Sequence, residues 1–196
     1  CDRRQRQTCI RDSFDFYQTG AVNIPIPSSD HIEPFLAAGI KGLWTYYCCS
    51  QGREVSNRFI AMPSSRTRII GAQLWKYRIT GFLHWGYNFW YTRFSRRAIN
   101  PYVTLDGGCF TPAGDCSSVY PGPCGVPYQS LHMKAFTEAL SDLRAMTLAE
   151  SLCGRDAVLR AAEAAGEVTF SRYPRERDGA FSLRARVNAL IESAVK

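Results

Sequence analysis

Strand-like and helix-like segments alternate along most of the chain, and this alternation restricts the possible folds more than any other feature. Residues 21–27, 42–50 and 81–90 are rich in apolar and aromatic side chains, which predicts three strands. Residues 31–38 and 64–78 separate them and have the apolar spacing of helices. Because strand and helix recur about every thirty residues, we expect parallel strands joined by crossover helices. Residues 117–120 predict a fourth short strand.

The remaining segments predict a helical C-terminal part. Three helices are expected at 129–152, 155–165 and 181–195, with a charged, flexible linker at 166–180. The apolar positions expected to line the buried face of the first of these helices are Leu131, Phe136, Leu140, Leu143, Met146 or Leu148, and Leu152.

We predict a division into an N-terminal remnant or loop (1–20), a strand–helix domain (21–153) and a helical extension (154–196). Four strands fit either a small open sheet or half of a (β/α)₈ barrel, which needs eight strands and about 250 residues.

The segment 81–90, GFLHWGYNFW, is the most aromatic part of the sequence. In parallel α/β folds, binding sites form where the strands end at their C-terminal tips. Aromatic faces stack on sugar rings or bases, and amide and hydroxyl groups bind their polar atoms; the alternative is that several of these rings fill the interior. The candidate substrate-binding residues at the predicted strand ends are Trp44, Tyr46, Tyr47, His84, Trp85, Tyr87, Asn88, Trp90, Asp115 and Tyr120.

The sequence gives no candidate for acid–base catalysis. Glycoside hydrolysis usually needs two flanking carboxyl groups, and no predicted strand end carries two. Asp115 and Asp106 are interpreted as turn residues, and His84 as a core histidine unless its ring points into the site. No serine triad, phosphate loop or metal-ligand spacing is present, so we expect no catalytic residue, cofactor or metal within this chain.

Charge and cysteine content restrict the partners. The formal charge is +7, but its arginines are scattered, which favours a solvated surface over nucleic-acid binding. The sequence shows neither an apolar run long enough for a membrane span nor a leader, so we expect no membrane partner and a cytoplasmic location.

The eight cysteines lack metal or disulfide spacing and are expected to be reduced thiols. Because the chain starts at Cys1, we expect a trimmed start or a piece of a longer protein.

Several stretches together resemble a known family. They are LWTYYCC (43–49), NRFIAMPSSRTRIIGAQLWKY (57–77), GFLHWGYNFW (81–90), PAGDCSSVYPGP (112–123) and SLHMKAFTEALSDLRAM (130–146). In this order they resemble the C-terminal part of domain-of-unknown-function family 4091. That family is similar to the catalytic barrel of glycoside hydrolase family 123, the β-N-acetylgalactosaminidases. The resemblance covers residues 22–152, and the tail after 155 lies outside it.

The resemblance implies an α/β fold that is the C-terminal half of a (β/α)₈ barrel, with about four parallel strands and C-terminal helices after them. It also implies a β-sandwich before the complete barrel and a substrate-assisted retaining mechanism. In that mechanism the sugar's own 2-acetamido group attacks the anomeric carbon. An adjacent Asp stabilises the resulting oxazolinium, and the next Glu is the acid. That Asp-Glu pair belongs to an earlier strand, and no Asp-Glu word occurs here. The sequence departs from the family at Cys124, His132 and Lys134, which puts the polar network under the long helix in doubt.

We therefore expect a fragment that supplies the aromatic sugar-binding wall of an N-acetylhexosaminidase-type site. Its partners would be an N-acetylhexosamine-containing glycan and the N-terminal half of the barrel. Whether the chain is itself an enzyme is left open. The alternatives are a non-catalytic carbohydrate-binding or assembly module, and a nucleic-acid-binding protein.

Overall fold

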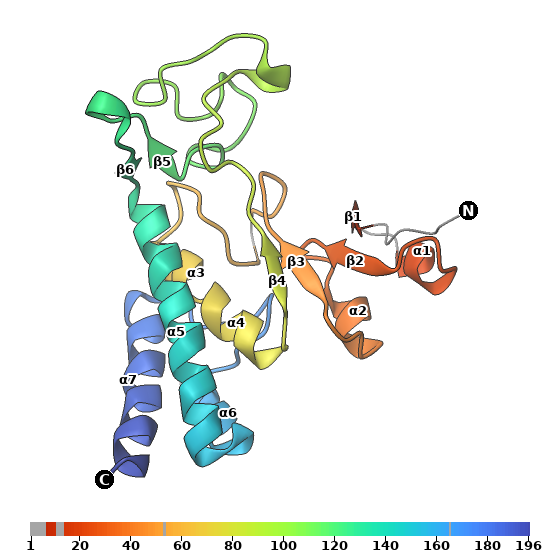
Figure 1. The fold of residues 1–196 in the computed structure, drawn as a ribbon, viewed down its shortest axis with the longest axis vertical. Helices are drawn as coiled ribbons and strands as arrows, with labels where there is room; N and C mark the ends of the chain where they lie inside the picture. Colours follow the sequence, from red (N-terminus) through yellow and green to blue (C-terminus); the bar gives the residue numbers. More distant parts are fainter. Residues whose placement is uncertain (1–6, 11–13, 53, 165) are drawn as a thin grey trace.

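The computed structural model describes residues 7–10, 14–52, 54–164 and 166–196. A series of short strands lies beside a block of helices, and an irregular lobe lies beyond the strand ends (Figure 1). The strands are β1 (Gln7–Ile10), β2 (Ile24–Pro27), β3 (Trp44–Tyr46), β4 (Gly81–Leu83), β5 (Val119–Tyr120) and β6 (Tyr128–Gln129). The helices are α1 (Phe14–Gln18), α2 (Glu33–Ala37), α3 (Ser64–Arg68), α4 (Ile70–Lys76), α5 (Leu131–Cys153), α6 (Arg155–Glu163) and α7 (Arg177–Ala194), with 3₁₀ turns η1 (Arg93–Ser95) and η2 (Pro123–Gly125).

The first four strands are parallel, as the alternation of segments predicts. β1 pairs with β2, and β3 pairs with β4 in the register Trp44↔Gly81. A parallel bridge between Ser28 and Tyr46 connects the end of β2 to β3. Strands that follow one another in the sequence therefore lie next to each other. The described part of residues 1–20, for which we expect a remnant or loop, contains β1 and α1. The result is a mixed α/β fold with few strands; closure as a half barrel remains a proposal.

The parallel strands are much shorter than the sequence predicts. β3 and β4 have three residues each, so the backbone leaves the ladder before Tyr47 and before His84. The expected fourth parallel strand is also wrong. β5 pairs antiparallel with β6, in the register Val119↔Gln129. The turn between them, which begins with Pro121 and Gly122, returns the chain directly to β5 instead of passing through a crossover helix.

The helices agree with the predicted segments in position but differ in detail. The predicted helix 64–78 divides at Ile69 into α3 and α4. The long helix α5 begins after Ser130, whose Oγ accepts a hydrogen bond of 3.1 Å from the backbone N–H of Met133. α6 and α7 follow as the predicted C-terminal helices, and both lie alongside α5 (Figure 1). Among the described residues, no helix has the length and apolar character that crossing a bilayer requires.

The buried face of α5 is lined by small residues and not by most of the predicted leucines. Ala139, Ala145 and Ala149 are at most 8% exposed, whereas Leu131 is 79% and Leu148 49% exposed. Leu140 and Leu152 are also exposed; Met146 is fully buried, and Phe136 and Leu143 are partly buried against the core. At Ala139 a small residue is required by the close approach of α4, since a Cβ on Gly71 would lie 1.9 Å from the carbonyl oxygen of Ala139.

One buried carboxylate joins three helices at this contact. Asp142 is 3% exposed and accepts hydrogen bonds from Arg68 Nε at 2.7 Å and from Arg184 Nη1 at 2.8 Å. Arg68 belongs to α3 and Arg184 to α7, so the C-terminal helix is attached to the strand–helix region through α5. Ile69 and Trp75 share one apolar cluster with residues of α5, α6 and α7.

The segment before α7 is packed, so the predicted flexible linker at 166–180 is wrong for its described part. Val168 and Phe170 are 1% and 2% exposed, and the Phe170 ring stacks on Tyr77 with centroids 5.4 Å apart. Gln73 Nε2 donates a 2.7 Å hydrogen bond to the carbonyl of Thr169. Apolar residues inside a charged segment therefore anchor it across the face of α4.

Candidate functional site

A buried ion pair lies beyond the ends of β3 and β4. Arg58, in the loop before α3, places Nη2 3.2 Å from Asp115 Oδ1, and the two side chains are 1% and 0% exposed. The same nitrogen donates to the backbone carbonyls of Asp115 at 2.6 Å and Trp85 at 2.9 Å. One guanidinium thus holds together the loop after β3, the segment after β4 and the lobe before β5.

Asp115 is oriented from its other side by an indole. Its Oδ2 accepts a 3.1 Å hydrogen bond from Trp85 Nε1. Burial raises the pKa of Asp115 to about 6, although the nearby Arg58 charge opposes the rise. The prediction that this carboxylate caps its own turn is wrong, because the carboxylate points to Arg58 and Trp85. The same prediction for Asp106 is confirmed, since its Oδ1 accepts from the N–H of Gly108 at 3.0 Å.

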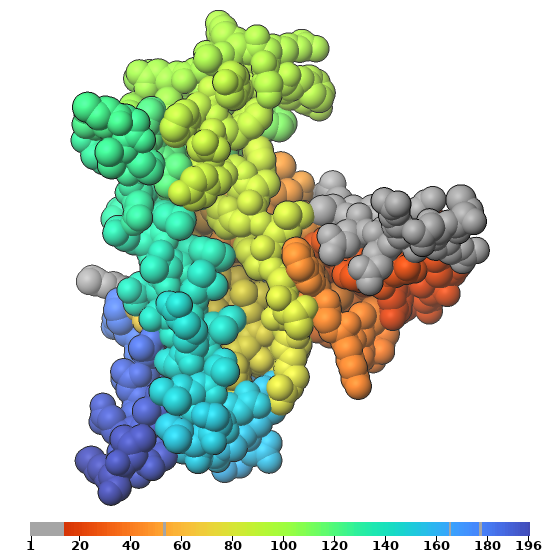
Figure 2. Space-filling model, in the orientation of Figure 1, coloured from red at the N-terminus to blue at the C-terminus, as the bar shows by residue number. Residues whose placement is uncertain are grey.

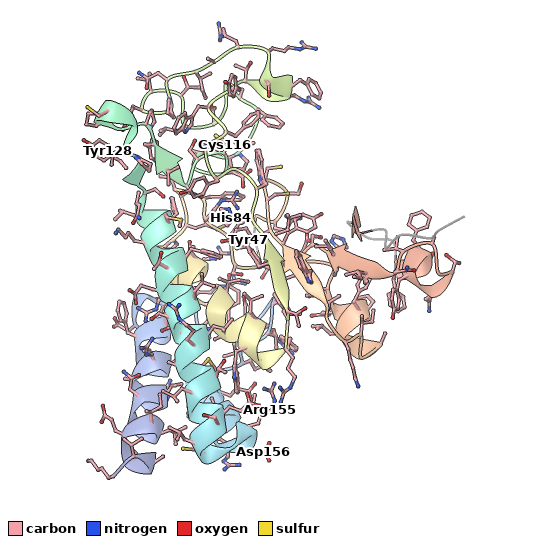
Figure 3. The ribbon with its side chains drawn as sticks, viewed as in Figure 1. Tyr47, His84, Cys116, Tyr128, Arg155 and Asp156 are labelled. Carbon is pink, nitrogen blue, oxygen red and sulfur yellow. The ribbon has the colours of Figure 1, made fainter. Side chains whose placement is uncertain are left out.

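Tyr47 and His84 continue this cluster at the ends of β3 and β4, where Figure 3 labels them close together. Tyr47 is fully buried, and the Arg58 guanidinium lies 5.2 Å from its ring centroid. Burial raises the pKa of Tyr47 to about 12. The His84 ring lies 6.0 Å from that of Tyr47 and 5.2 Å from that of Phe136. Burial and the Arg58 charge lower the pKa of His84 to about 4, so the imidazole is neutral near pH 7.

Several polar atoms of the cluster have no hydrogen-bond partner within the described part of the chain. They include Arg58 Nε and Nη1, the Tyr47 hydroxyl and His132 Nδ1. Burial and the Arg58 charge also lower the pKa of His132. Buried donors without partners are costly, so natural proteins usually keep them where a function needs them. The cluster therefore combines the Arg58–Asp115 ion pair with the imidazoles of His84 and His132, whose pKa values are both lowered.

An apolar pocket of about 290 Å³ adjoins the ion pair. Trp85 belongs to both, since it lines the pocket while its N–H binds Asp115. Phe110 closes another side and contacts Trp85 with ring centroids 6.2 Å apart. The volume is near the lower end for small-molecule sites, which suits one ring with a polar edge. The pocket is lined by Tyr46, Tyr47, Cys48, Cys49, Leu83, Trp85 and Phe110.

The structure gathers five of the ten candidate residues in this region: Tyr46, Tyr47, His84, Trp85 and Asp115. The other five lie elsewhere. The Trp44 ring lies across Gly81, where a Cβ would approach it to 2.1 Å. Tyr87 and Asn88 are exposed, and Trp90 donates its indole N–H to the carbonyl of Val119 at 3.1 Å. Tyr120 lines a second groove of about 520 Å³ together with Tyr102, Tyr128 and His132.

The candidates chosen from the sequence omit Arg58 and four residues of the pocket lining, which are Cys48, Cys49, Leu83 and Phe110. Arg58 falls between the predicted strand 42–50 and the predicted helix 64–78. The available signal is its place in the word NRFIAMP, where one arginine stands beside apolar residues. Phe110 lies among turn-forming glycines, and nothing local distinguishes it from a solvent-exposed ring.

No group of histidine, cysteine and carboxylate side chains suited to a metal ion occurs among the described residues. Six cysteines have described side chains and all six are free thiols: Cys48, Cys49, Cys109, Cys116, Cys124 and Cys153. Many of the arginines are engaged with carboxylates rather than arranged as a free basic stripe. Those in ion pairs are Arg58, Arg68, Arg78, Arg155, Arg172, Arg175 and Arg184.

Comparisons with known proteins agree with this picture. The model of the family described as "Glycoside hydrolase 123, catalytic domain" matches residues 5–149, which include the whole cluster. No curated protein sequence matches the chain. A solved structure of a family 123 glycoside hydrolase from Clostridium perfringens, described for glycolipid glycan hydrolysis, is similar with a TM-score of 0.65 and 15% identity. The similarity covers 96% of this chain and 35% of that one, so this chain spans about a third of its neighbour's length.

Proposed function

This chain belongs to the glycoside hydrolase 123 catalytic-domain family, and we propose that it forms the aromatic, sugar-binding side of an N-acetylhexosaminidase-type barrel site. The ligand class is an N-acetylhexosamine-containing glycan. The Asp-Glu pair of the expected substrate-assisted mechanism is supplied by residues outside this chain. The 35% share of the solved neighbour that this chain matches supports the proposal that other residues complete the site.

Trp85 is the residue whose position carries the proposal. Its ring lines the apolar pocket, and its N–H is held by Asp115, which is itself held by Arg58. An indole fixed in this way stacks on the apolar face of a pyranose without losing rotational freedom on binding. Arg58 and Asp115 act as positioning residues, because both are fully buried and touch the substrate only through Trp85.

Asp115 is not the acid in this proposal. Its carboxyl is fully buried and already engaged by Arg58 and Trp85, so its proton is not delivered to a glycosidic oxygen. The 2-acetamido group of the sugar is the nucleophile, and the completing residues carry the acid. Without that acid, the chain alone lacks a contribution of about 10²–10⁴-fold to the rate.

The test compares two preparations for hydrolysis of an aryl N-acetyl-β-galactosaminide. One is the purified chain, and the other is the chain co-expressed with a polypeptide covering the preceding part of the family barrel. We expect background activity from the chain alone and hydrolysis from the completed pair. Hydrolysis above background by the chain alone would overturn the proposed division of the site.

A binding measurement then isolates the pocket. In a glycan array, Trp85→Ala should weaken binding by about 1–3 kcal/mol, the scale of a lost aromatic stack. Tyr87→Ala is the matched control, since this tyrosine is 49% exposed and lies outside the pocket. Equal losses from the two variants would argue against the pocket. Glycan binding with no hydrolysis in the completed pair would favour the non-catalytic binding or assembly module.

A further inference from the structure

A tight hairpin projects from the lobe between β4 and β5. Tyr91 and Ala98 form an antiparallel bridge. The N–H of Thr92 donates to the carbonyl of Arg97 at 2.9 Å, and the N–H of Ile99 donates to that of Trp90 at 3.0 Å. These bonds leave residues 93–97, RFSRR, as the hairpin tip. The lobe that carries the tip extends beyond the strand ends and the helices (Figure 2).

The tip combines one apolar ring with three positive charges. Phe94 is 70% exposed, and Arg93, Arg96 and Arg97 are all exposed. No aspartate or glutamate occurs between residues 86 and 105, and none of the three arginines forms an ion pair with a described residue. This distinguishes them from the seven arginines named above, which are paired with carboxylates.

The exposed ring is held in place by its surroundings. Phe94 and Ser95 have φ values of 60° and 54°, a conformation that residues other than glycine adopt rarely. The guanidinium carbons of Arg93 and Arg96 lie 4.8 and 5.5 Å from the Phe94 ring centroid. The ring therefore stands at the apex of the hairpin with positive charge around it instead of folding back onto the lobe.

We propose that the hairpin tip is a peripheral contact site for a bilayer surface that carries anionic headgroups. The three guanidinium groups pair with the headgroups, and Phe94 enters the interfacial layer. A convex tip cannot enclose a small anion, and the pockets described above are lined by other residues. An extended anionic surface with an apolar layer beneath it satisfies both the charges and the exposed ring. Such a contact requires no membrane span, and it replaces the expectation of no membrane partner.

The hairpin tip is connected to the sugar pocket through one residue. The guanidinium of Arg93 lies 5.9 Å from the ring of Phe110, which lines the pocket beside Trp85. A bilayer contact at the tip would thus bring the pocket near the membrane surface. Binding to vesicles does not depend on hydrolysis, so this inference and the proposed function fail in different experiments.

Vesicle flotation tests the proposal, because protein aggregates sediment while vesicle-bound protein floats. The probes are vesicles of phosphatidylcholine alone and vesicles in which roughly a third of the lipid is phosphatidylserine. We expect the full chain to float only with the anionic vesicles. Each arginine at such a surface contributes roughly fivefold to the affinity, so Arg93→Gln with Arg96→Gln should weaken binding about 30-fold.

The matched control is Arg144→Gln with Arg160→Gln, which removes the same charge from exposed positions on α5 and α6. It should leave binding nearly unchanged. Phe94→Ser should reduce binding while Phe181→Ser, at a ring that is 59% exposed on α7, should not. All four variants alter exposed side chains, so a circular-dichroism melt should confirm that each is folded. Equal losses from tip and control variants, equal binding to neutral vesicles, or binding to RNA or heparin but not to vesicles would each overturn the proposal.

Discussion

Arg58 and Asp115 are 57 residues apart in the sequence, yet the guanidinium of the first lies against the carboxylate of the second with both side chains buried. The carbonyl of Trp85 binds the same guanidinium. Three loops that emerge from the strand ends therefore meet at one charge. Because each charge is removed from water, each needs the other, and this dependence leads to the first two predictions.

Removal of the arginine charge should be costly for folding. Arg58→Met leaves the Asp115 carboxylate and two backbone carbonyls buried without their partner and should lower the free energy of unfolding by about 3–5 kcal/mol. Arg172→Met is the control for the same chemical change, since the Arg172–Glu167 pair is exposed on both sides. That variant should change stability by less than about 1 kcal/mol. Urea denaturation measures both, and similar small losses would contradict a structural role for the buried pair.

The pH dependence of stability should contain two opposing contributions from the cluster. Asp115 has a pKa of about 6 when folded against an ordinary 3.8, so the folded state binds this proton more tightly. Its contribution to stability is present at low pH and is lost as the pH rises from about 4 to about 6. His84 has a pKa of about 4 against an ordinary 6.5, so the unfolded state binds its proton more tightly. Its contribution therefore increases as the pH rises from about 4 to 6.5.

Variants should separate these two contributions. Relative to the parent chain, Asp115→Asn should gain stability as the pH rises through this range, because the variant lacks the contribution of Asp115 that the parent loses. The lowered pKa of His132 acts on stability in the same direction as that of His84. His84→Gln should lose relative stability over the same range. Chemical denaturation at several pH values measures both differences. Parallel pH profiles for all three proteins would contradict the altered pKa values.

Gly86 should tolerate no side chain. Its φ is +67°, and a Cβ there would lie 2.2 Å from the carbonyl oxygen of Asp115. Gly125 has a similar φ of +77° but no atom within 4 Å of a Cβ. Gly125→Ala should cost only the backbone conformation, about 1–2 kcal/mol. Gly86→Ala should cost more, because it also displaces Asp115 from Arg58. Thermal melts of the two variants measure both costs. Equal losses of stability would count against the steric argument.

Phe170 should contribute more to stability than the leucines on the outer side of α5. Its ring is 2% exposed, whereas Leu148 is 49% exposed. Phe170→Ala should cost about 3–5 kcal/mol, as large core truncations do. Leu148→Ala should stay within about 0.5 kcal/mol. The opposite order in urea denaturation would restore the sequence-based assignment of a flexible linker and a leucine-lined buried face.

Local sequence patterns predict which segments become strands and helices, because spacing of apolar residues reflects burial on one face. They place the starts of β2, β3, β4 and the C-terminal helices within a few residues. They do not predict how far β3 and β4 extend, since aromatic residues after Tyr46 and Leu83 suit a strand and a packed loop equally well. Whether β5 pairs parallel or antiparallel depends on the turn that follows it. The residue pattern of Ser117–Tyr120 alone does not predict that pairing.

The buried face of α5 shows a different failure. Leucine is the more apolar choice, so a sequence pattern assigns Leu131 and Leu148 to the core. Where α4 meets α5, however, Gly71 and Ala139 approach so closely that only small residues fit at that point, and Met146 is buried elsewhere on the helix. Hydrophobicity is a property of one residue, whereas the space available is a property of two packed elements.

The sequence by itself determined the order of the elements, the aromatic character of the segment around Trp85 and the words that resemble a glycoside-hydrolase family. Only the tertiary structure decided that Trp85 shares a pocket with Tyr46 and Phe110, and that Arg58 is the partner of Asp115. The physical reason is that desolvation and contact act on residues that are close in space. Their strength depends on distances of a few ångströms between segments that folding brings together, and no local pattern encodes those distances.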